Sequence, residues 1–302
     1  MKFHGSICAI VTPFVASGEV DLPAFERLLD WHLAAGTRGM VVGGSTGESA
    51  SLDDAEFDRL VECAVSRLRG RMPVIAGCGA AATHKALRLC ERARALGADA
   101  ALVVTPYYVR PTQEGLYRHY SVLADRGGLP LIVYNVPTRT GCDMQPETVA
   151  RLAAHADISG VKEAVAAPER MDALLDLKSD SFAVLSGDDP TATRAMLAGA
   201  DGVISVAANV CPGAMQHVCE LAMGGHTNEA RTADAALAPV YAFLGVEPNP
   251  IPAKALLARM GRIGPGLRLP LLELSAAHHA AANDCVATLS RIEHAIAADR
   301  AA

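Results

Sequence analysis

The sequence predicts an α/β fold, a (β/α)8 TIM barrel followed by a C-terminal helical region. Short apolar, β-branched runs alternate with helical patterns eight times over roughly 225 residues, which is the repeat number of an eight-stranded barrel. Most of these runs are apolar throughout instead of alternating with polar residues. That composition is expected for parallel strands buried on both faces.

The eight predicted strands follow one another in steady alternation with the helical patterns. Each is a short run rich in valine, isoleucine, leucine or alanine. They are expected at residues 6–13, 39–45, 72–79, 99–106, 129–137, 158–164, 182–189 and 201–209.

The segments between the strands carry helix start signals. Asp21, Asp53 and Thr83 open the first three helices, and Pro146 and Pro168 lie near the first turns of later ones. A doubly wound open sheet is the competing fold, but it favours fewer strands and a glycine-rich dinucleotide loop after the first strand. The first turn reads TPFVASGEV instead, so we prefer the barrel.

The sequence also predicts two regions. Residues 1–225 form the barrel, and residues 226–302 form a helical appendage to it, not a freely moving domain. Three helical patterns fall in the second region, NEARTADAALAPVYAFL, IPAKALLARM and NDCVATLSRIEHAIAADR, with GRIGPGLRLP as a loop.

Composition and charge exclude several classes of protein. A net charge of −6 without a run of lysine or arginine provides no basic surface for nucleic acid. No apolar stretch reaches membrane-spanning length, and the N-terminus has no signal-peptide pattern. The eight cysteines include no C-x-x-C pair, so reduced thiols and a cytoplasmic location are expected. The histidines lack metal-ligand spacing, so no metal is expected.

Polar residues gather at the predicted carboxyl ends of the strands, where a barrel of this kind carries its active site. They are Thr12, Ser45, Thr46, Glu48, Thr105, Tyr107, Tyr108, Tyr134, Asn135, Arg139, Lys162, Glu163, Ser186, Asp188 and Ser205.

Lys162 ends the sixth predicted strand, ISGVKEA. An amine surrounded by apolar strands is desolvated, which lowers its pKa, and a neutral amine can form a Schiff base with a carbonyl substrate. A solvated ion pair with Glu163 at the barrel rim is an equally good interpretation of the pattern. Because adjacent strand residues point to opposite faces, however, Glu163 is not expected to share the barrel interior with Lys162.

Three further candidates lie at other strand ends. Tyr134 ends the fifth strand, where a phenol could shuttle protons, although a core tyrosine is the alternative. The turn GGSTGE, residues 43–48, offers two hydroxyls and small residues that let backbone N–H groups approach a carboxylate. Arg139 follows a proline-stiffened turn, where it could bind a second carboxylate or be an ordinary surface residue.

Several motifs together, in this order, resemble the pyruvate-dependent class I aldolase family, also called the N-acetylneuraminate lyase family, and within it the dihydrodipicolinate synthases most closely. The resemblance covers nearly the whole chain and rests on GGSTGES, VTPYYVRPTQEGLY, YNVPTRTG, GVKEA, LSGDD, GVISVAANV and VEPNPIPAK.

The resemblance implies an enzyme without a cofactor, working through a covalent imine, and a homotetramer built as a dimer of dimers. It implies that Lys162 forms the imine with pyruvate, that Tyr134 transfers protons and that Thr46 binds the pyruvate carboxylate. Tyr108 is implied to reach into the neighbouring subunit's site and to complete a hydroxyl relay.

The resemblance also assigns the outer part of the site. Arg139 is implied to receive the carboxylate of aspartate semialdehyde, and Ile204 and Gly187 to line the pyruvate pocket. Ser45 stands where the synthases usually have a threonine, so the linking hydroxyl is kept but the methyl that fixes its rotamer is lost. The serine form also occurs in sialic-acid lyases and sugar-acid aldolases of the family, which generally lack the arginine.

The leading hypothesis is therefore a lyase that condenses pyruvate with L-aspartate 4-semialdehyde to 4-hydroxy-tetrahydrodipicolinate, in lysine and diaminopimelate biosynthesis. The alternative is a related pyruvate-dependent aldolase, dehydratase or deaminase acting on a sugar acid or a hydroxyproline-derived substrate. A third hypothesis, a barrel kept only for binding or regulation, is disfavoured because Lys162, Tyr134, Tyr108 and Arg139 are all present. The expected partners are small-molecule substrates and further copies of the chain.

Feedback by L-lysine is expected to be weak or absent. Lysine-sensitive family members carry two histidines, an asparagine and a glutamate in a pocket at the dimer interface. The matching positions here are Asp54, Phe57, Ala81 and Lys85, with Ser49, Ala50 and Tyr107 retained. The cation of Lys85 thus replaces the carboxylate that would hold the effector's ammonium group.

Overall fold

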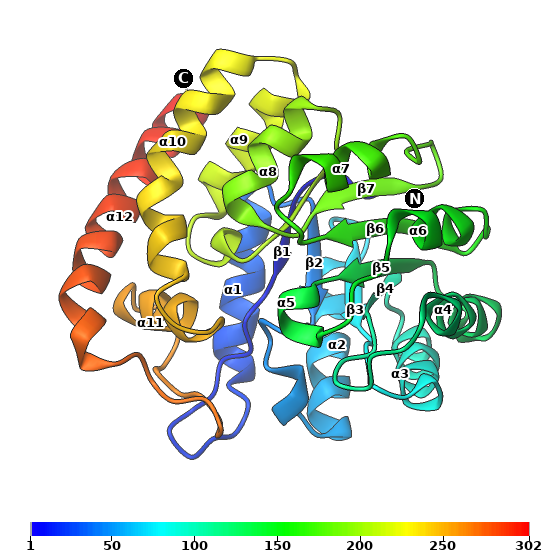
Figure 1. Cartoon of the computed structure of the whole chain (residues 1–302). Helices are drawn as coiled ribbons and strands as arrows, with labels where there is room; N and C mark the ends of the chain where they lie inside the picture. The colour runs from blue at the N-terminus through cyan, green and yellow to red at the C-terminus, as the bar shows by residue number, and fades with distance from the viewer. Residues whose placement is uncertain (1, 302) are drawn as a thin grey trace.

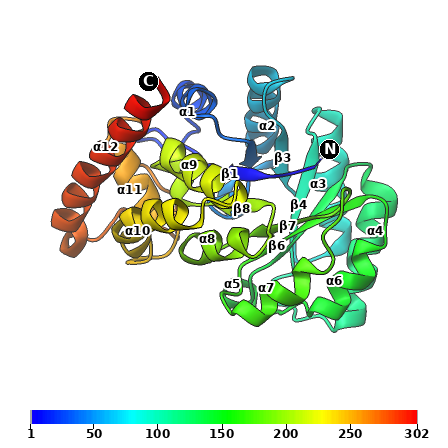
Figure 2. The same ribbon diagram turned by 90° about the horizontal axis from the view of Figure 1, so that it is seen from above.

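Eight parallel strands close a barrel in sequence order in the computed structural model, which describes residues 2–301 (Figures 1 and 2). The ring closes where β1 pairs with β8, with Ile7 opposite Ile204. The predicted TIM barrel is confirmed and the open sheet is excluded. The strands are β1 Gly5–Ala9, β2 Gly39–Val42, β3 Val74–Gly77, β4 Ala100–Val104, β5 Leu131–Asn135, β6 Ile158–Glu163, β7 Ala183–Ser186 and β8 Gly202–Ser205.

Helices surround the barrel on its outer side (Figure 2). They are α1 Leu22–Ala35, α2 Asp54–Leu68, α3 Thr83–Ala95, α4 Gln113–Gly127, α6 Pro146–Ala153, α7 Pro168–Leu175, α8 Asp189–Leu197 and α9 Pro212–Met223. The short helix α5, Pro137–Thr140, follows β5 directly and lies at the carboxyl end of the strands (Figure 1). The chain ends in α10 Thr227–Leu244, α11 Ile251–Arg259 and α12 His279–Ala301, which lie together beside α9 at one side of the barrel (Figure 1, yellow to red). The division of the chain at residue 226 stays a prediction.

Local sequence signals explain where the first helices begin. The Asp21 side chain accepts a hydrogen bond from the N–H of Ala24 and caps α1. Asp53 and Glu56 form a reciprocal capping box at the start of α2. Thr83 is the first residue of α3, as expected. Because all the strands run parallel in one closed barrel, their carboxyl ends meet at one rim.

The core has two parts, and strand parity decides which side chains enter each. Alternate residues point into the barrel or out toward the helices, as Ile7 and Cys8 do on β1. Inside the barrel, residues including Ile75, Ile132 and Leu185 fill the space, so the barrel is a packed core and not a pore. The barrel interior below the carboxyl-end rim is thus largely apolar.

Within residues 2–301, every helix is too short or too polar to cross a membrane. The same residues contain no group of three histidine, cysteine, aspartate or glutamate side chains arranged to hold a metal ion. The eight cysteines all lie in this part of the chain and are free thiols.

Candidate active site

Lys162 lies inside the barrel at the carboxyl end of β6, next to Tyr134 on β5. The two residues are register partners in the sheet, and the Lys162 Nζ atom lies 4.2 Å from the centre of the Tyr134 ring. Only 4% of Lys162 is exposed, and its other register partner is Leu185 of the interior core. The amine is therefore held against an aromatic face and away from bulk water.

Burial changes the acid–base behaviour of this amine. Desolvation lowers the pKa of Lys162 to about 8, the Asp189 carboxylate opposes the shift, and the Arg139 guanidinium adds to it. Roughly a tenth of the amine is thus neutral at pH 7, far more than for an ordinary lysine, and the neutral form is the one that attacks a carbonyl carbon.

Glu163 points out of the barrel, as its position beside Lys162 predicts. Its carboxylate accepts hydrogen bonds from Asn135 Nδ2 at 3.1 Å and from the N–H of Val165 at 2.8 Å. Burial raises the pKa of Glu163 to about 7. The alternative interpretation of Lys162 as a solvated partner of Glu163 is therefore wrong.

Tyr134 presents its phenol to the same interior space. Burial raises the pKa of Tyr134 to about 12, against the opposing charge of Arg139, so the hydroxyl keeps its proton at neutral pH. A protonated phenol beside a neutral amine can give a proton to an oxygen that leaves and take it back afterwards.

The turn over residues 43–48 is packed too closely for larger residues. A Cβ atom on Gly77 of β3 would lie 2.2 Å from the Gly43 carbonyl oxygen, and Phe57 of α2 packs beneath Gly43. Thr12 Oγ1 donates a hydrogen bond to the Gly47 carbonyl oxygen at 2.7 Å. Glycine at these positions therefore lets the turn approach the strand ends closely.

The two hydroxyls of this turn differ in environment. Thr46 is buried, and its Oγ1 atom accepts a hydrogen bond from Asn249 Nδ2 at 2.9 Å. Ser45 is exposed at the rim. Arg139, in the short helix α5, is also exposed and donates through Nη2 to the Asn249 carbonyl oxygen at 3.3 Å.

Gly187 packs against the Lys162 side chain, and Ile204 lies in the interior core of the barrel. A Cβ atom on Gly187 would lie 2.9 Å from Lys162 Cε, so any larger residue here would press on the lysine side chain. The Gly187 N–H donates to the Glu163 carbonyl oxygen at 2.6 Å. Ile204, on β8, belongs to the interior core and is 1% exposed.

Tyr108 stands apart from the other predicted residues within one chain. It is 91% exposed, its φ angle is 73°, and its N–H donates to the Thr140 carbonyl oxygen. A non-glycine residue in the left-handed region carries backbone strain, which the surrounding structure must hold. The side chain is thus presented outward from the rim.

Sequence reasoning missed two residues of the site. Asp189, the first residue of α8, is buried, and its Oδ2 atom accepts the N–H groups of Val206 at 3.0 Å and Ala207 at 2.8 Å, directly after β8. Asn249 is the second, through its contacts with Thr46 and Arg139. Asp188, which the sequence singled out instead, accepts a hydrogen bond from Thr191.

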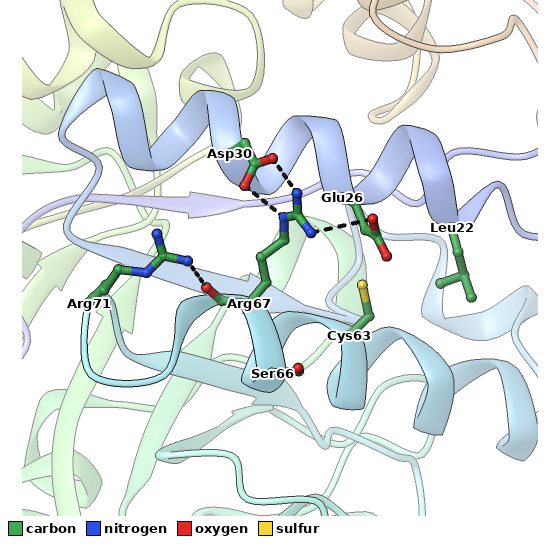
Figure 3. A pocket seen from close by; sticks show the side chains of 7 residues that line it. All are labelled: Leu22, Glu26, Asp30, Cys63, Ser66, Arg67 and Arg71. Carbon is green, nitrogen blue, oxygen red and sulfur yellow. Dashed lines mark hydrogen bonds and ion pairs between the residues drawn. The ribbon is translucent and has the colours of Figure 1, made fainter.

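A surface pocket between α1 and α2 contains none of the predicted site residues (Figure 3). In this pocket the Arg67 side chain pairs with Asp30 and Glu26 across the two helices. Its lining is Leu22, Glu26, Asp30, Cys63, Ser66, Arg67 and Arg71. These ion pairs join exposed helix faces, and the pocket carries none of the chemistry described above.

Comparison with known proteins identifies the family. The model of the dihydrodipicolinate synthetase family matches residues 2–289. The chain belongs to this family. It is 57% identical over 294 residues to the 4-hydroxy-tetrahydrodipicolinate synthase of Stenotrophomonas maltophilia strain K279a, an alignment that covers 97% of this chain and 98% of that relative.

Solved structures of the dihydrodipicolinate synthetase family share the whole fold. The chloride-inhibited dihydrodipicolinate synthase of Acinetobacter baumannii, solved in complex with pyruvate, is 44% identical, with a TM-score of 0.93 over 95% of this chain and 99% of that one. A monomeric dihydrodipicolinate synthase variant is 41% identical, with a TM-score of 0.93 over 95% of this chain and 97% of that one. The predicted family membership is confirmed.

Proposed function

We propose that the chain condenses pyruvate with L-aspartate 4-semialdehyde to 4-hydroxy-tetrahydrodipicolinate through a Schiff base on Lys162. The observation that carries the proposal is the buried Lys162 amine, 4.2 Å from the centre of the Tyr134 ring. The name shared by relatives of more than half identity supports the same reaction over the alternative aldolase, dehydratase and deaminase activities.

The first half of the reaction needs only this amine and proton transfers. Neutral Lys162 Nζ attacks C2 of pyruvate, and the resulting carbinolamine loses its hydroxyl as water to leave a protonated imine. The Tyr134 phenol supplies the proton to the departing hydroxyl and recovers a proton afterwards. The imine serves as the electron sink, so no external cofactor is required.

The second half forms the new carbon–carbon bond. Loss of a proton from C3 of the imine gives an enamine, and C3 then bonds to the aldehyde carbon of the semialdehyde while the aldehyde oxygen takes up a proton. The amine of the semialdehyde attacks C2 and displaces Lys162 Nζ, which closes the ring and frees the enzyme. Ser45 and Tyr108 would carry protons between the site and the surface.

The two carboxylates have separate partners in this proposal. Thr46 binds the pyruvate carboxylate at the buried end of the site, where Ile204 and Gly187 form the pocket walls. Arg139, exposed at the mouth, binds the carboxylate of the semialdehyde, because a planar guanidinium pairs with a carboxylate through two parallel hydrogen bonds.

We also propose that the chain acts in the cytoplasm as a homotetramer, a dimer of dimers, in which Tyr108 enters the neighbouring subunit's site. The exposed loop supports this proposal, because Tyr107, Tyr108 and Val109 are 43%, 91% and 55% exposed and a second copy would cover them. Light scattering of the purified chain should give the mass of four copies. A monomer active at full rate would refute this arrangement.

The reaction is tested by a coupled assay with pyruvate and L-aspartate 4-semialdehyde, beside a panel of other aldehydes and sugar acids. We expect the semialdehyde to be consumed fastest. Faster retro-aldol cleavage of a sugar acid would favour the aldolase alternative. Pyruvate binding without turnover of any acceptor would favour the hypothesis that the barrel serves only for binding or regulation.

A further inference from the structure

Asn249, in the segment between α10 and α11, contacts both groups that we assign to substrate carboxylates. Its side-chain Nδ2 donates to Thr46 Oγ1 at 2.9 Å, and its carbonyl oxygen accepts from Arg139 Nη2 at 3.3 Å. One residue of the C-terminal region thus joins Thr46, the proposed carboxylate-binding residue at the buried end of the site, to Arg139, the proposed one at its mouth.

The direction of the bond to Thr46 decides what that hydroxyl can do. A threonine hydroxyl has one proton to donate and two acceptor positions. Because Asn249 donates to Thr46, the Thr46 proton is left free to donate elsewhere, which is what binding a carboxylate requires. Asn249 Oδ1 is buried and accepts no hydrogen bond within the described residues, so the side chain's hydrogen bond is the one that Nδ2 donates to Thr46.

The backbone that carries Thr46 is already fixed by other contacts. Lys254 Nζ, fully buried, donates to Glu48 Oε1 at 2.5 Å and to the Thr12 carbonyl oxygen at 2.9 Å. The N–H of Arg268 donates to the other Glu48 oxygen at 3.2 Å. With the turn held in this way, only the rotation of the Thr46 side chain is left to be fixed. The hydrogen bond from Asn249 Nδ2 fixes it.

We infer that Asn249 is a positioning residue that turns the Thr46 hydroxyl toward the pyruvate carboxylate and holds Arg139 at the mouth of the site. This inference rests on the proposed function. It assigns to the C-terminal region a part in substrate recognition, because the site is incomplete without Asn249, two residues before the start of α11.

Two substitutions separate donation from packing. Asn249→Ala removes the donor and the volume, while Asn249→Asp keeps the volume but accepts a hydrogen bond and adds a negative charge near the bound carboxylate. We expect the KM for pyruvate to rise about tenfold in the alanine variant and further in the aspartate variant, with smaller changes in kcat. A purely structural role predicts the reverse order, with alanine the more damaging change.

Asn228→Asp, the same change on the exposed first turn of α10, is the matched control and should leave the KM for pyruvate unchanged. The inference is overturned if Asn249→Ala and Asn249→Asp both keep the wild-type KM, or if alanine is the worse of the two while thermal stability falls in parallel.

A double-mutant cycle with Thr46→Val supplies a second readout. Once the Thr46 hydroxyl is gone, Asn249→Ala should raise the KM for pyruvate no further, whereas independent effects that multiply would contradict the inference. Failure of the proposed function looks different, because the wild-type chain itself would then fail to form a pyruvate imine.

Discussion

The Lys162 amine and the Tyr134 ring face each other across two adjacent strands, with Nζ 4.2 Å from the ring centre. Each group is buried, and burial moves their pKa values in opposite directions, to about 8 for the amine and about 12 for the phenol. At neutral pH the pair therefore combines a partly neutral nucleophile with a protonated donor. This combination is what carbinolamine formation and dehydration require.

The rate of imine formation should follow the titration of Lys162. Because its pKa lies at about 8 and not at the ordinary 10.5, the neutral amine increases as the pH rises toward 8 and becomes the major form above it. We expect the rate of pyruvate trapping by borohydride to rise with pH up to about 8 and then to level off. A rate that is still rising tenfold per pH unit above 9 would contradict this.

Removing the phenol hydroxyl should slow the reaction without unfolding the chain. We expect Tyr134→Phe to lower kcat by about 10² or more, because general acid–base transfer contributes on that scale. Tyr120→Phe is the matched control, since the Tyr120 hydroxyl is also buried but donates to the Val103 carbonyl oxygen in the outer core. It should cost about 1 kcal/mol of unfolding free energy and leave kcat near the wild-type value.

The buried pair of Lys254 and Glu48 should matter for stability. Lys254→Met leaves the Glu48 carboxylate buried without its cation, which we expect to lower the unfolding free energy by roughly 3–5 kcal/mol in a denaturant titration. The double variant Lys254→Met with Glu48→Gln removes both charges and should recover much of that loss. A double variant that is less stable than the single one would refute the explanation.

L-lysine should inhibit the enzyme weakly or not at all. Asp54 is already paired with Arg92 at 2.7 Å, and Phe57 is apolar and buried under the turn, so neither offers the effector a free polar contact. Lys85 adds a like charge against the effector's ammonium group. Initial rates with added L-lysine, compared with a sodium salt at equal ionic strength, test this prediction. Half-maximal inhibition below a millimolar concentration would show it to be wrong.

The fold and the centre of the site were predictable because they depend on local patterns. Eight apolar runs fix the barrel, and strand parity places Lys162 inside it and Glu163 outside. Tyr134 follows from the same argument, since it lies near the carboxyl end of the neighbouring strand, opposite Lys162. These inferences need only the order of residues along each strand and the geometry of parallel sheets.

The supporting residues were not predictable in this way, because their contacts join distant parts of the chain. Asn249 meets Thr46 across 203 positions, and Lys254 meets Glu48 across 206. Asp189 was missed in favour of Asp188 because the start of α8 decides which of two adjacent carboxylates turns inward. Sequence periodicity carries no information on how a C-terminal segment returns to a barrel rim.

Reductive trapping tests the central claim most directly. The chain is treated with pyruvate and borohydride and digested, and the masses of its lysine-containing peptides are measured by mass spectrometry. The Lys162→Met variant is the control. We predict one reduced pyruvyl group per chain, on the peptide that contains Lys162, and none in the control. An unmodified Lys162 peptide, or the same group on another lysine such as Lys254, would contradict the account.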